Sequence, residues 1–275
     1  MTRLTSSDVR TIDCWEEYDR RIRLQLGVDL LTLASASADL PAAEVRRRLA
    51  GRKLAAVSIS SGGGVVGGFA ESLAAIGRHL GMDGRVMEAP DDEGFAQAAR
   101  WGAEVVIHAD DQQFLARDAQ GRMADNNPAT SRAFAAALEL MAEGRSLAGR
   151  EVVVLGLGII GRGAALRLAE LGASPLMYDP DEGKRAQAAA ECGSGVILGD
   201  QADLAEALSG TNLIFEAVPS DEVLDKKFWP KYPVVAAPGV PLAWPERWLR
   251  PGGPGRLWHD PLQSGTAAML AQLSL

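Results

Sequence analysis

The chain alternates between short apolar runs and segments in which apolar residues recur at helical spacing. In the first half, three apolar runs predict strands, at residues 54–60, 84–89 and 104–109. Helical periodicity lies between them, as in the series Phe69, Leu73, Ile76 and Leu80. This β-α-β-α-β order predicts a small parallel sheet. The residues before it, 6–50, have a helical pattern.

The middle of the chain interrupts this alternation. Two short extended runs within 113–125 flank Gly121, as in a β-hairpin. Asn127 followed by Pro128 then predicts a helix start, with Asn127 as the capping residue, and Gly144 can end this helix. We expect this helix to connect two domains.

From residue 151 the alternation resumes. Six strands are predicted, at 151–155, 174–178, 195–197, 212–215, 234–236 and 256–258. Six is the number of strands in a complete dinucleotide-binding sheet. The stretch 238–255 holds five prolines and is expected to be an irregular surface loop, and residues 265–275 are expected to form a helix.

The pattern therefore predicts an α/β protein of two domains. Residues 1–145 would form a smaller N-terminal α/β substrate domain with leading helices, and residues 146–275 a C-terminal Rossmann dinucleotide-binding domain. A length of 275 residues suits two domains, and 47% hydrophobic with 23% charged residues is ordinary for a folded chain.

Charge and cysteine content narrow the function classes. A formal net charge of −8 argues against a nucleic-acid partner. Cys14 and Cys192 lack CxxC partners and the three histidines lie far apart, so we expect no metal site. The N-terminus is polar, and no apolar run approaches the about 18 residues of a membrane span. We expect a cytoplasmic protein with a small-molecule substrate and no membrane partner, and a homodimer stays open.

The strongest motif is a glycine fingerprint, GxGxxG, directly after the strand at 151–155. Gly156 would permit the tight turn, Gly158 would let a pyrophosphate approach the backbone, and Gly161 would let helix and strand pack closely. The phosphates would then bind the free N–H groups of the first helical turn, which includes Ile159 and Ile160.

Two further segments complete the predicted cofactor site. Asp179 ends the second strand of this domain, 23 residues after Gly156, where a carboxylate binds the adenosine ribose. It would repel a 2′-phosphate and favour NAD over NADP, although Arg185 could soften that preference. The segment Ala217, Val218 and Pro219 follows the fourth strand and should lie beside the nicotinamide ribose. The alternative is a Rossmann-like domain that binds no dinucleotide or binds another nucleoside, such as S-adenosylmethionine.

Candidate substrate residues follow strands of the first domain. The run from Ser60 to Gly64 is small enough to leave backbone N–H groups open to an anionic group, or it is a flexible turn. Asp110 and Asp111 end the third strand, where paired carboxylates can hold an ammonium or shuttle a proton, or are simply solvated in a capped loop. Asp260, after the last strand of the chain, is a second cation-binding candidate.

One absence matters for the choice of reaction. Shikimate-dehydrogenase-like and methylene-tetrahydrofolate-dehydrogenase-like enzymes share this domain order but use a lysine in the first domain. The only lysine before residue 184 is Lys53, at a strand start, which is the wrong end for chemistry. This argues against both activities.

Several segments together resemble the pyrrolysine synthase (PylD) family, and they run in order over nearly the whole chain. The segments are 61–73, 109–116, 124–128, 154–158, 214–219, 237–241 and 261–270. The segments outside the glycine fingerprint are the specific ones, because generic dehydrogenases lack them.

The resemblance implies a substrate, L-lysine acylated on its ε-nitrogen by 3-methyl-D-ornithine (a lysine-methylornithine isopeptide). NAD would take a hydride from the carbon that bears the ornithine side-chain amine. The imine would lose ammonia through water, and the resulting aldehyde would condense with the α-amine to close a pyrroline ring. The alternatives are another NAD(P)-dependent amino-acid or amine dehydrogenase without ring closure, and a non-enzymatic NADH-sensing protein.

The resemblance also implies residue roles. Asp110 would stabilise the developing iminium-like charge, and Asp260 would assist by holding an amine. Ser61 and Gly62 would take part of the lysine end, next to Ala109, and Leu4 would cover the substrate as a lid. Asp260 stands where the family pattern has glutamate, so its reach is shorter.

Overall fold

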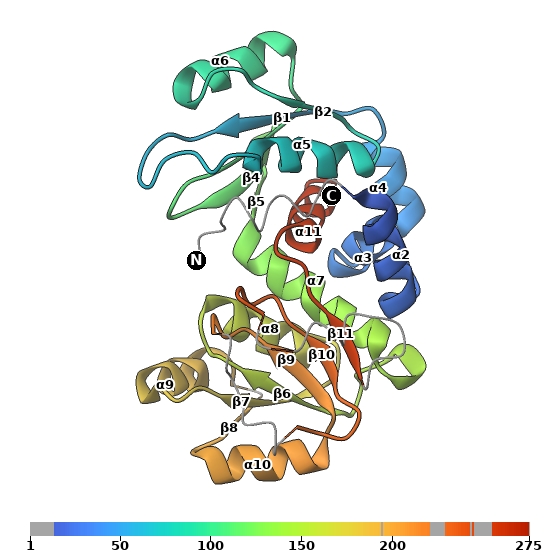
Figure 1. Ribbon diagram of the computed structural model, residues 1–275, viewed down its shortest axis with the longest axis vertical. Helices are drawn as coiled ribbons and strands as arrows, with labels where there is room; N and C mark the ends of the chain where they lie inside the picture. The colour runs from blue at the N-terminus through green and yellow to red at the C-terminus, as the bar shows by residue number, and fades with distance from the viewer. Residues whose placement is uncertain (1–13, 194, 221–228, 243, 245–254, 275) are drawn as a thin grey trace. The chain divides into compact units, whose positions relative to one another are not determined.

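The protein consists of two packing units, and Figure 1 labels most of their helices and strands. The computed structural model describes residues 14–193, 195–220, 229–242, 244 and 255–274. Of these described residues, 14–19, 29–133 and 261–274 belong to the first unit, and those within 20–28 and 134–260 belong to the second. Each unit has its own sheet with helices packed against it. The predicted two-domain α/β fold class is confirmed.

The first unit contains a five-stranded sheet in the order β2-β1-β3-β4-β5. Its strands are β1 (Lys53–Ser58), β2 (Asp83–Val86), β3 (Val105–Ala109), β4 (Phe114–Asp118) and β5 (Met123–Asp125). β1 pairs in parallel with β2 and with β3, as the sequence predicts. β4 and β5 form the expected hairpin, and β4 also pairs antiparallel with β3, so the hairpin extends the sheet.

Helices connect and precede these strands. They are α2 (Trp15–Leu26), α3 (Leu30–Ser37), α4 (Ala42–Leu49), α5 (Phe69–His79) and α6 (Asp91–Trp101). The continuous helical pattern over 6–50 is thus divided into three helices, and residues 6–13 lie outside the described residues. Gly27, with φ of 71°, ends α2 in a left-handed conformation that favours glycine. Pro41 precedes α4, where its missing N–H costs no helical hydrogen bond.

The last helix, α11 (Gln263–Gln272), packs in the first unit, so the predicted domain boundaries are wrong for this segment. Every residue from 263 to 271 is buried, and α11 contacts α3, α4, α5, β4 and β5. A helix built of small and apolar residues on all sides must be covered on all sides. The first unit surrounds α11, although the chain reaches it only after completing the other sheet.

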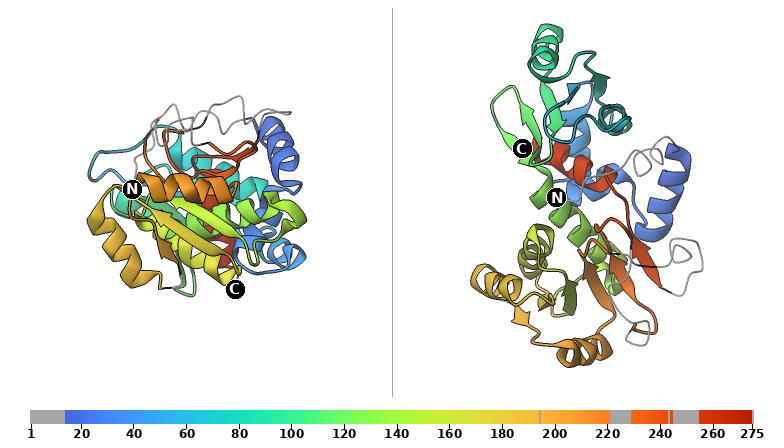
Figure 2. Two further views of the ribbon diagram at one scale, coloured as in Figure 1. Left: turned by 90° about the horizontal axis from the view of Figure 1, so that it is seen from below. Right: turned by 60° about the vertical axis from the view of Figure 1, so that its left-hand side comes forward.

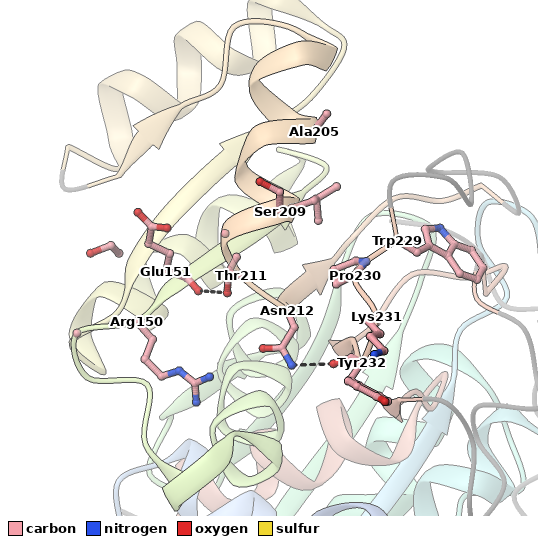
Figure 3. A pocket seen from close by; sticks show the side chains of 14 residues that line it. Arg150, Glu151, Ala205, Ser209, Thr211, Asn212, Trp229, Pro230, Lys231 and Tyr232 are labelled. Atoms are coloured by element: carbon pink, nitrogen blue, oxygen red, sulfur yellow. Dashed lines mark hydrogen bonds between the residues drawn. The ribbon is translucent and has the colours of Figure 1, made fainter.

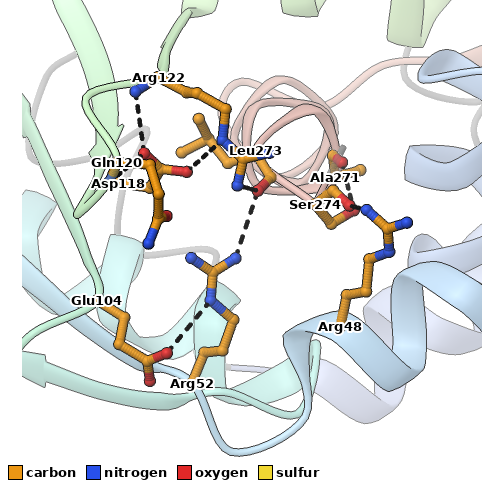
Figure 4. Close-up of polar contacts among 9 residues, drawn as sticks. All are labelled: Arg48, Arg52, Glu104, Asp118, Gln120, Arg122, Ala271, Leu273 and Ser274. Atoms are coloured by element: carbon orange, nitrogen blue, oxygen red, sulfur yellow. Dashed lines mark hydrogen bonds and ion pairs between the residues drawn. The ribbon is translucent and has the colours of Figure 1, made fainter.

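Arginine side chains bind the carbonyl groups at the end of α11 (Figure 4). Arg122 and Arg52 both donate to the Leu273 carbonyl, at 3.1 Å and 3.4 Å, and Arg48 donates to the Ser274 carbonyl. Positive groups at this position satisfy carbonyls that the helix leaves unpaired and complement the helix dipole. They attach the C-terminal helix to the rest of the first unit.

The second unit contains six strands, and each of the described strand pairings is parallel, in the order β11-β10-β9-β6-β7-β8. The strands are β6 (Glu151–Leu155), β7 (Ser174–Tyr178), β8 (Val196–Ile197), β9 (Leu213–Glu216), β10 (Val234–Ala236) and β11 (Arg256–Trp258). In chain order within the unit this is 3-2-1-4-5-6 read from β8, the arrangement of a dinucleotide-binding Rossmann sheet. The predicted Rossmann domain is confirmed.

The helices that cover the Rossmann sheet can be followed in Figures 1 and 2. They are α8 (Ile159–Glu170), α9 (Glu182–Glu191) and α10 (Gln201–Gly210). On one side, Leu204 and Leu208 of α10 pack with Val153, Leu155 and Ile214 in a continuous apolar core. Burial of such side chains stabilises the sheet by about 1.5–3 kcal/mol for each large residue.

The connecting helix α7 (Asn126–Met141) begins two residues earlier than predicted. The carboxylate of Asp125 accepts from the N–H of Asn127 at 2.7 Å, so Asp125 and not Asn127 acts as the cap. Gly144, with φ of 68°, lies in the short 3-10 helix η2 (Glu143–Arg145) just after α7. The units divide within α7, between residues 133 and 134.

Two expectations concern the rest of the chain. The predicted loop at 238–255 lies largely outside the described residues. Within the part of the chain that the structure describes, no helix is both long and apolar enough to cross a membrane.

We predict that Arg122→Ala destabilises the first unit by about 3 kcal/mol. Arg122 donates to the buried carboxylate of Asp118 at 2.6 Å and to the Leu273 carbonyl, so its loss leaves a buried charge without its partner. Urea unfolding measures the change. The matched control is Arg100→Ala, which removes an exposed pair with Glu93 and should cost about 0.5 kcal/mol or less. Equal losses in the two variants would contradict the assignment.

Candidate dinucleotide site and substrate loops

The glycine-rich turn at the end of β6 depends on two positions that cannot hold a side chain. Gly156 has φ of 85°, and a Cβ there would lie 2.9 Å from the Ala217 carbonyl oxygen. A Cβ on Gly161 would lie 1.8 Å from the Gly156 carbonyl oxygen. The start of α8 therefore packs directly on the turn, and the loop after β9 packs on its other side. The roles predicted for these two glycines agree with this geometry.

The N-terminus of α8 leaves space at Gly158 for the close approach of a ligand. Gly158 is the N-cap residue and, having no side chain, makes no capping hydrogen bond of its own. A Cβ on Gly158 would meet nothing within 4 Å, in contrast to Gly156 and Gly161. Ile159, the first helical residue, is 56% exposed, and Ile160 follows it in the same turn. Helix N-termini bind phosphate groups through their N–H groups and positive dipole end. These residues fit a dinucleotide.

Asp179 lies directly beside this turn, at the end of β7. One carboxylate oxygen accepts from the N–H of Leu157 at 2.8 Å and the other from the N–H of Asp181 at 2.9 Å. The side chain is almost fully buried, and the Lys184 amine lies 3.6 Å from it. Asp179 therefore also fixes the turn itself, and its oxygens reach ribose hydroxyls only through their remaining lone pairs.

The loop Ala217–Pro219 lies against the same turn. The N–H of Ala217 donates to the Leu155 carbonyl at 2.8 Å, which continues the pairing of β9 with β6 by one residue. The structure thus places the predicted cofactor residues together at the carboxyl edge of the Rossmann sheet. Sequence reasoning missed Glu216, the residue before this loop, and Arg162, which donates to the Leu157 carbonyl at 2.8 Å. The available signals were a charged residue directly after the fingerprint, Arg162, and one directly before the predicted loop, Glu216.

The predicted substrate residues lie at one edge of the first sheet. β1 and β3 are neighbours, with Ser58 opposite Ala109, so Ser61 and Gly62 follow one strand and Asp110 follows the other. A Cβ on Gly62 would lie 2.1 Å from a carboxylate oxygen of Asp111, which shows how closely the two loops approach. The neighbouring parallel strands bring these loops together.

Asp110 is held in an ionised form. Its Oδ1 accepts from the N–H groups of Gln112 and Gln113, both at 2.7 Å. These hydrogen bonds hold the pKa of Asp110 below its usual value, with a smaller contribution from His108. A carboxylate that stays ionised suits the stabilisation of a cation better than the transfer of a proton near neutral pH.

The glycine loop differs from its expected role. The N–H of Gly63 donates to Asp111 at 2.5 Å, and the N–H of Ser60 donates to Asp91 at 2.8 Å. The expectation of open N–H groups for an anionic ligand is wrong at these two positions, because carboxylates from neighbouring loops already bind them. The loop carries negative charge around it, which favours a cationic ligand group over an anionic one.

The remaining residues considered for the site are His108, Asp260 and Leu4. His108 stacks edge-on against Phe95, and burial lowers its pKa, so it is a packed, neutral residue. Asp260 is only 2% exposed, in the second unit next to His259, whose ring nitrogen pairs with the Ala237 carbonyl at 2.8 Å. Leu4 lies outside the described residues.

A pocket of about 980 Å³ lies elsewhere on the Rossmann unit (Figure 3). Glu151 and Ser174 begin β6 and β7, and Asn212 precedes β9, so the pocket lies at the amino ends of these strands. The glycine-rich turn follows the opposite end of β6. In Rossmann sheets, ligands bind beyond the carboxyl ends of the strands, and we therefore place the site at the turn and not in this pocket.

By its fold, this chain belongs to the class of proteins with two α/β units, one of which contains a Rossmann sheet. The chain is similar to shikimate 5-dehydrogenase from Thermus thermophilus, solved in complex with NADP(H) and shikimate, with a TM-score of 0.52 and 17% identity over 81% of this chain and 93% of that chain. It is also similar to shikimate dehydrogenase from Aquifex aeolicus, with a TM-score of 0.51 and 9% identity over 82% and 91%. Lys53, whose amine donates to the Trp101 carbonyl, lies at the amino end of β1, as expected from the sequence.

Within that class the chain belongs to the pyrrolysine synthase family. It is 33% identical to pyrrolysine synthase from Methanosarcina barkeri over 79% of this chain and 80% of that protein. The corresponding protein of Methanosarcina acetivorans is 32% identical over 79% and 81%. Residues 13–124 match the family model described as the N-terminal domain of pyrrolysine biosynthesis protein PylD. The resemblance found in the sequence is confirmed.

We predict that alanine substitutions at two glycines of the turn affect different properties, NADH binding in one case and stability in the other. Gly158→Ala should leave unfolding unchanged within about 1 kcal/mol, because the added carbon meets open space, but should weaken NADH binding about tenfold or more. Gly161→Ala should destabilise the protein without any ligand by about 3 kcal/mol, since α8 must shift away from the turn. Thermal unfolding and NADH fluorescence titration measure both effects. If Gly158→Ala bound NADH with the wild-type affinity, the diphosphate could not bind at this turn.

Proposed function

We propose that the protein is an NAD-dependent pyrrolysine synthase. Its substrate would be L-lysine-Nε-3-methyl-D-ornithine, and its products L-pyrrolysine, ammonium and NADH. The observation that carries the proposal is a glycine-rich turn of dinucleotide-binding geometry in a chain of the pyrrolysine synthase family. When bound, the cofactor supplies a hydride acceptor.

The proposed reaction has three balanced steps on the substrate. The carbon bearing the ornithine side-chain amine loses a hydride and the nitrogen loses a proton, which leaves an imine. Water adds to the imine and ammonia leaves, which gives an aldehyde. The α-amine then attacks the aldehyde carbon, and loss of water closes the pyrroline ring.

Asp110 has the charge that the first step requires. The reacting amine must be neutral, since an ammonium has no lone pair to stabilise the developing cation at carbon. Oδ1 of Asp110 is occupied by two N–H groups, while no described residue binds Oδ2, so we assign Oδ2 to the developing positive charge. The lowered pKa of Asp110 keeps this oxygen ionised.

The other candidates receive supporting roles. The Ser61 hydroxyl, exposed beside Gly62 and Ala109, is proposed to bind the lysine part of the substrate. The carboxylates around this loop, Asp91 and Asp111, would favour a substrate that carries amines. Asp260 is proposed to hold an amine, which requires it to be more exposed than its 2% here. Leu4 is proposed to cover the bound substrate.

The direct test is incubation of the full chain with the isopeptide and NAD. We expect an increase in NADH absorbance together with a product whose mass is lower than that of the substrate by one ammonia and two hydrogens. A product that retains the open aldehyde or its hydrate would indicate an amine dehydrogenase without ring closure. If Gly158→Ala formed NADH and bound NAD with the wild-type affinity, the proposed cofactor site would be wrong.

We predict that Asp110→Asn lowers kcat about 100-fold or more and leaves the affinity for NAD unchanged. The amide is isosteric and its oxygen can still accept from Gln112 and Gln113, but the charge that stabilises the cation is lost. Steady-state kinetics and NADH titration separate the two effects. Asp92→Asn, at an exposed position on α6, is the matched control and should behave as wild type. An Asp110→Asn variant with normal turnover would refute the assignment.

We predict that NAD binds more tightly than NADP, and that Asp179→Asn narrows the difference by roughly tenfold. The buried carboxylate at the turn repels a 2′-phosphate, whereas Lys184 and Arg185 beside it would attract one. Asp181→Asn is the control, because asparagine caps α9 as well as aspartate does. Dissociation constants for NADH and NADPH measure the ratio. A wild-type preference for NADPH would contradict the role of Asp179.

A further inference from the structure

Glu216 is the last residue of β9 and is fully buried. The strand reads Leu213, Ile214, Phe215 and then Glu216, with each residue inside the protein. Glu216 pairs in register with Leu155, the residue before the glycine-rich turn. A carboxyl group thus ends an otherwise apolar strand in the interior of the Rossmann sheet, directly before the loop Ala217–Pro219.

The carboxyl group lies between two loops. Its Oε1 accepts from the N–H of Val218 at 2.6 Å, which ties the loop after β9 back to the strand. Gly239, after β10, lies on another side, since a Cβ there would be 3.2 Å from Oε1 and 2.6 Å from the Val218 carbonyl oxygen. Oε2 is buried and has no hydrogen-bond partner among the described residues. Glu216 thus lies against the loops that follow β9 and β10.

Charged groups nearby pair with other residues. β6 and β10, which flank β9, contribute no ionisable side chain at this edge, and α8 carries Arg162 and Arg167. Arg162 pairs with Glu191 at 2.6 Å, and Arg167 pairs with Glu170 at 2.9 Å. None of these groups supplies Glu216 with a counter-charge within the described part of the chain.

Polar and charged groups at the ends of the neighbouring strands also bind other partners. Asp179, after β7, binds the N–H groups of Leu157 and Asp181. His259 and Asp260 follow β11, and a His259 ring nitrogen pairs with the Ala237 carbonyl. Burial raises the pKa of Glu216 to about 8, against the smaller lowering effect of the Val218 hydrogen bond. The group is therefore a neutral carboxylic acid at pH 7.

We propose that Glu216 is a positioning residue which, through its hydrogen bond with Val218, holds the loop Ala217–Pro219 in the conformation that receives the nicotinamide end of the cofactor. The inference rests on the proposed dinucleotide-dependent function and adds to it a residue that touches neither substrate nor cofactor. Its contact is with Val218, and it acts through that loop.

Ionisation of Glu216 removes this support. A buried carboxylate without a counter-charge is strongly disfavoured, so the ionised group draws water in or moves out, and the loop moves with it. The added negative charge also opposes the diphosphate of the cofactor. The competent, protonated form predominates well below pH 8, and its fraction declines as the pH rises through about 8. Apparent affinity declines with that fraction.

The experiment is an NADH titration of the full chain, by fluorescence, from about pH 6.5 to about pH 9.5. NADH is chosen because its nicotinamide ring is uncharged. We expect the wild-type dissociation constant to be level near pH 7 and up to about 30-fold higher at pH 9.5. Glu216→Gln, which keeps an acceptor for Val218 but cannot ionise, should bind as wild type does at pH 7 and show no alkaline loss.

Glu206→Gln is the matched control, an exposed glutamate on α10 that should leave the wild-type pH profile unchanged. A wild-type affinity that stays constant through pH 8, or the same alkaline loss in Glu216→Gln as in wild type, would overturn the inference. If Glu216→Gln does not fold, infrared difference spectra of the wild type supply the test. The band of a protonated carboxyl group must then disappear near pH 8 in step with the loss of affinity.

These outcomes separate the inference from the proposed function. If the wild type binds no NADH at any pH, the proposed cofactor use is wrong and the inference falls with it. If it binds NADH with a flat pH profile, the cofactor use stands and only the role of Glu216 is rejected.

Discussion

The close approach of α8 to the turn after β6 is the contact on which the rest of the Rossmann unit depends. A hydrogen in place of a side chain at Gly156 and Gly161 lets the helix start directly above the strand end, with the loop after β9 on the other side. The helix N-terminus is thereby placed at the end of the strand, with open space around Gly158. Asp179 reinforces the same turn through the N–H of Leu157. Binding of a diphosphate needs such a pre-organised set of N–H groups, because ordering them on binding would reduce affinity.

The first unit contains two groups of charged side chains, one of arginines and one of aspartates, which bind different backbone groups. At the end of α11, the side chains of Arg48, Arg52 and Arg122 satisfy helix carbonyls and hold a buried helix in place. At the edge that carries the candidate substrate loops, Asp91 and Asp111 bind backbone N–H groups and surround the glycine run with negative charge. The first arrangement stabilises the unit, and the second favours a cationic over an anionic group near these loops.

Carboxyl groups in this protein differ in charge state because their surroundings differ. Asp110 accepts two backbone hydrogen bonds and remains ionised, which suits it to stabilise positive charge. Glu216 lies in an apolar strand with one hydrogen bond, and burial keeps it protonated at neutral pH. Hydrogen bonding to the charged form and desolvation act in opposite directions on the same chemical group. The carboxyl group thus occurs in a charged form at Asp110 and in a neutral form at Glu216.

The sequence alone determined the fold class, the strands of both sheets, the glycine-rich turn and the family, since these follow from local periodicity and from motifs with fixed spacing. Only the tertiary structure decided where α11 packs, because a helix that is apolar on all sides does not specify its neighbours. It also decided that Asp111 occupies the N–H of Gly63 and that Glu216 is buried. These features depend on contacts between residues far apart in the chain, which no local pattern contains.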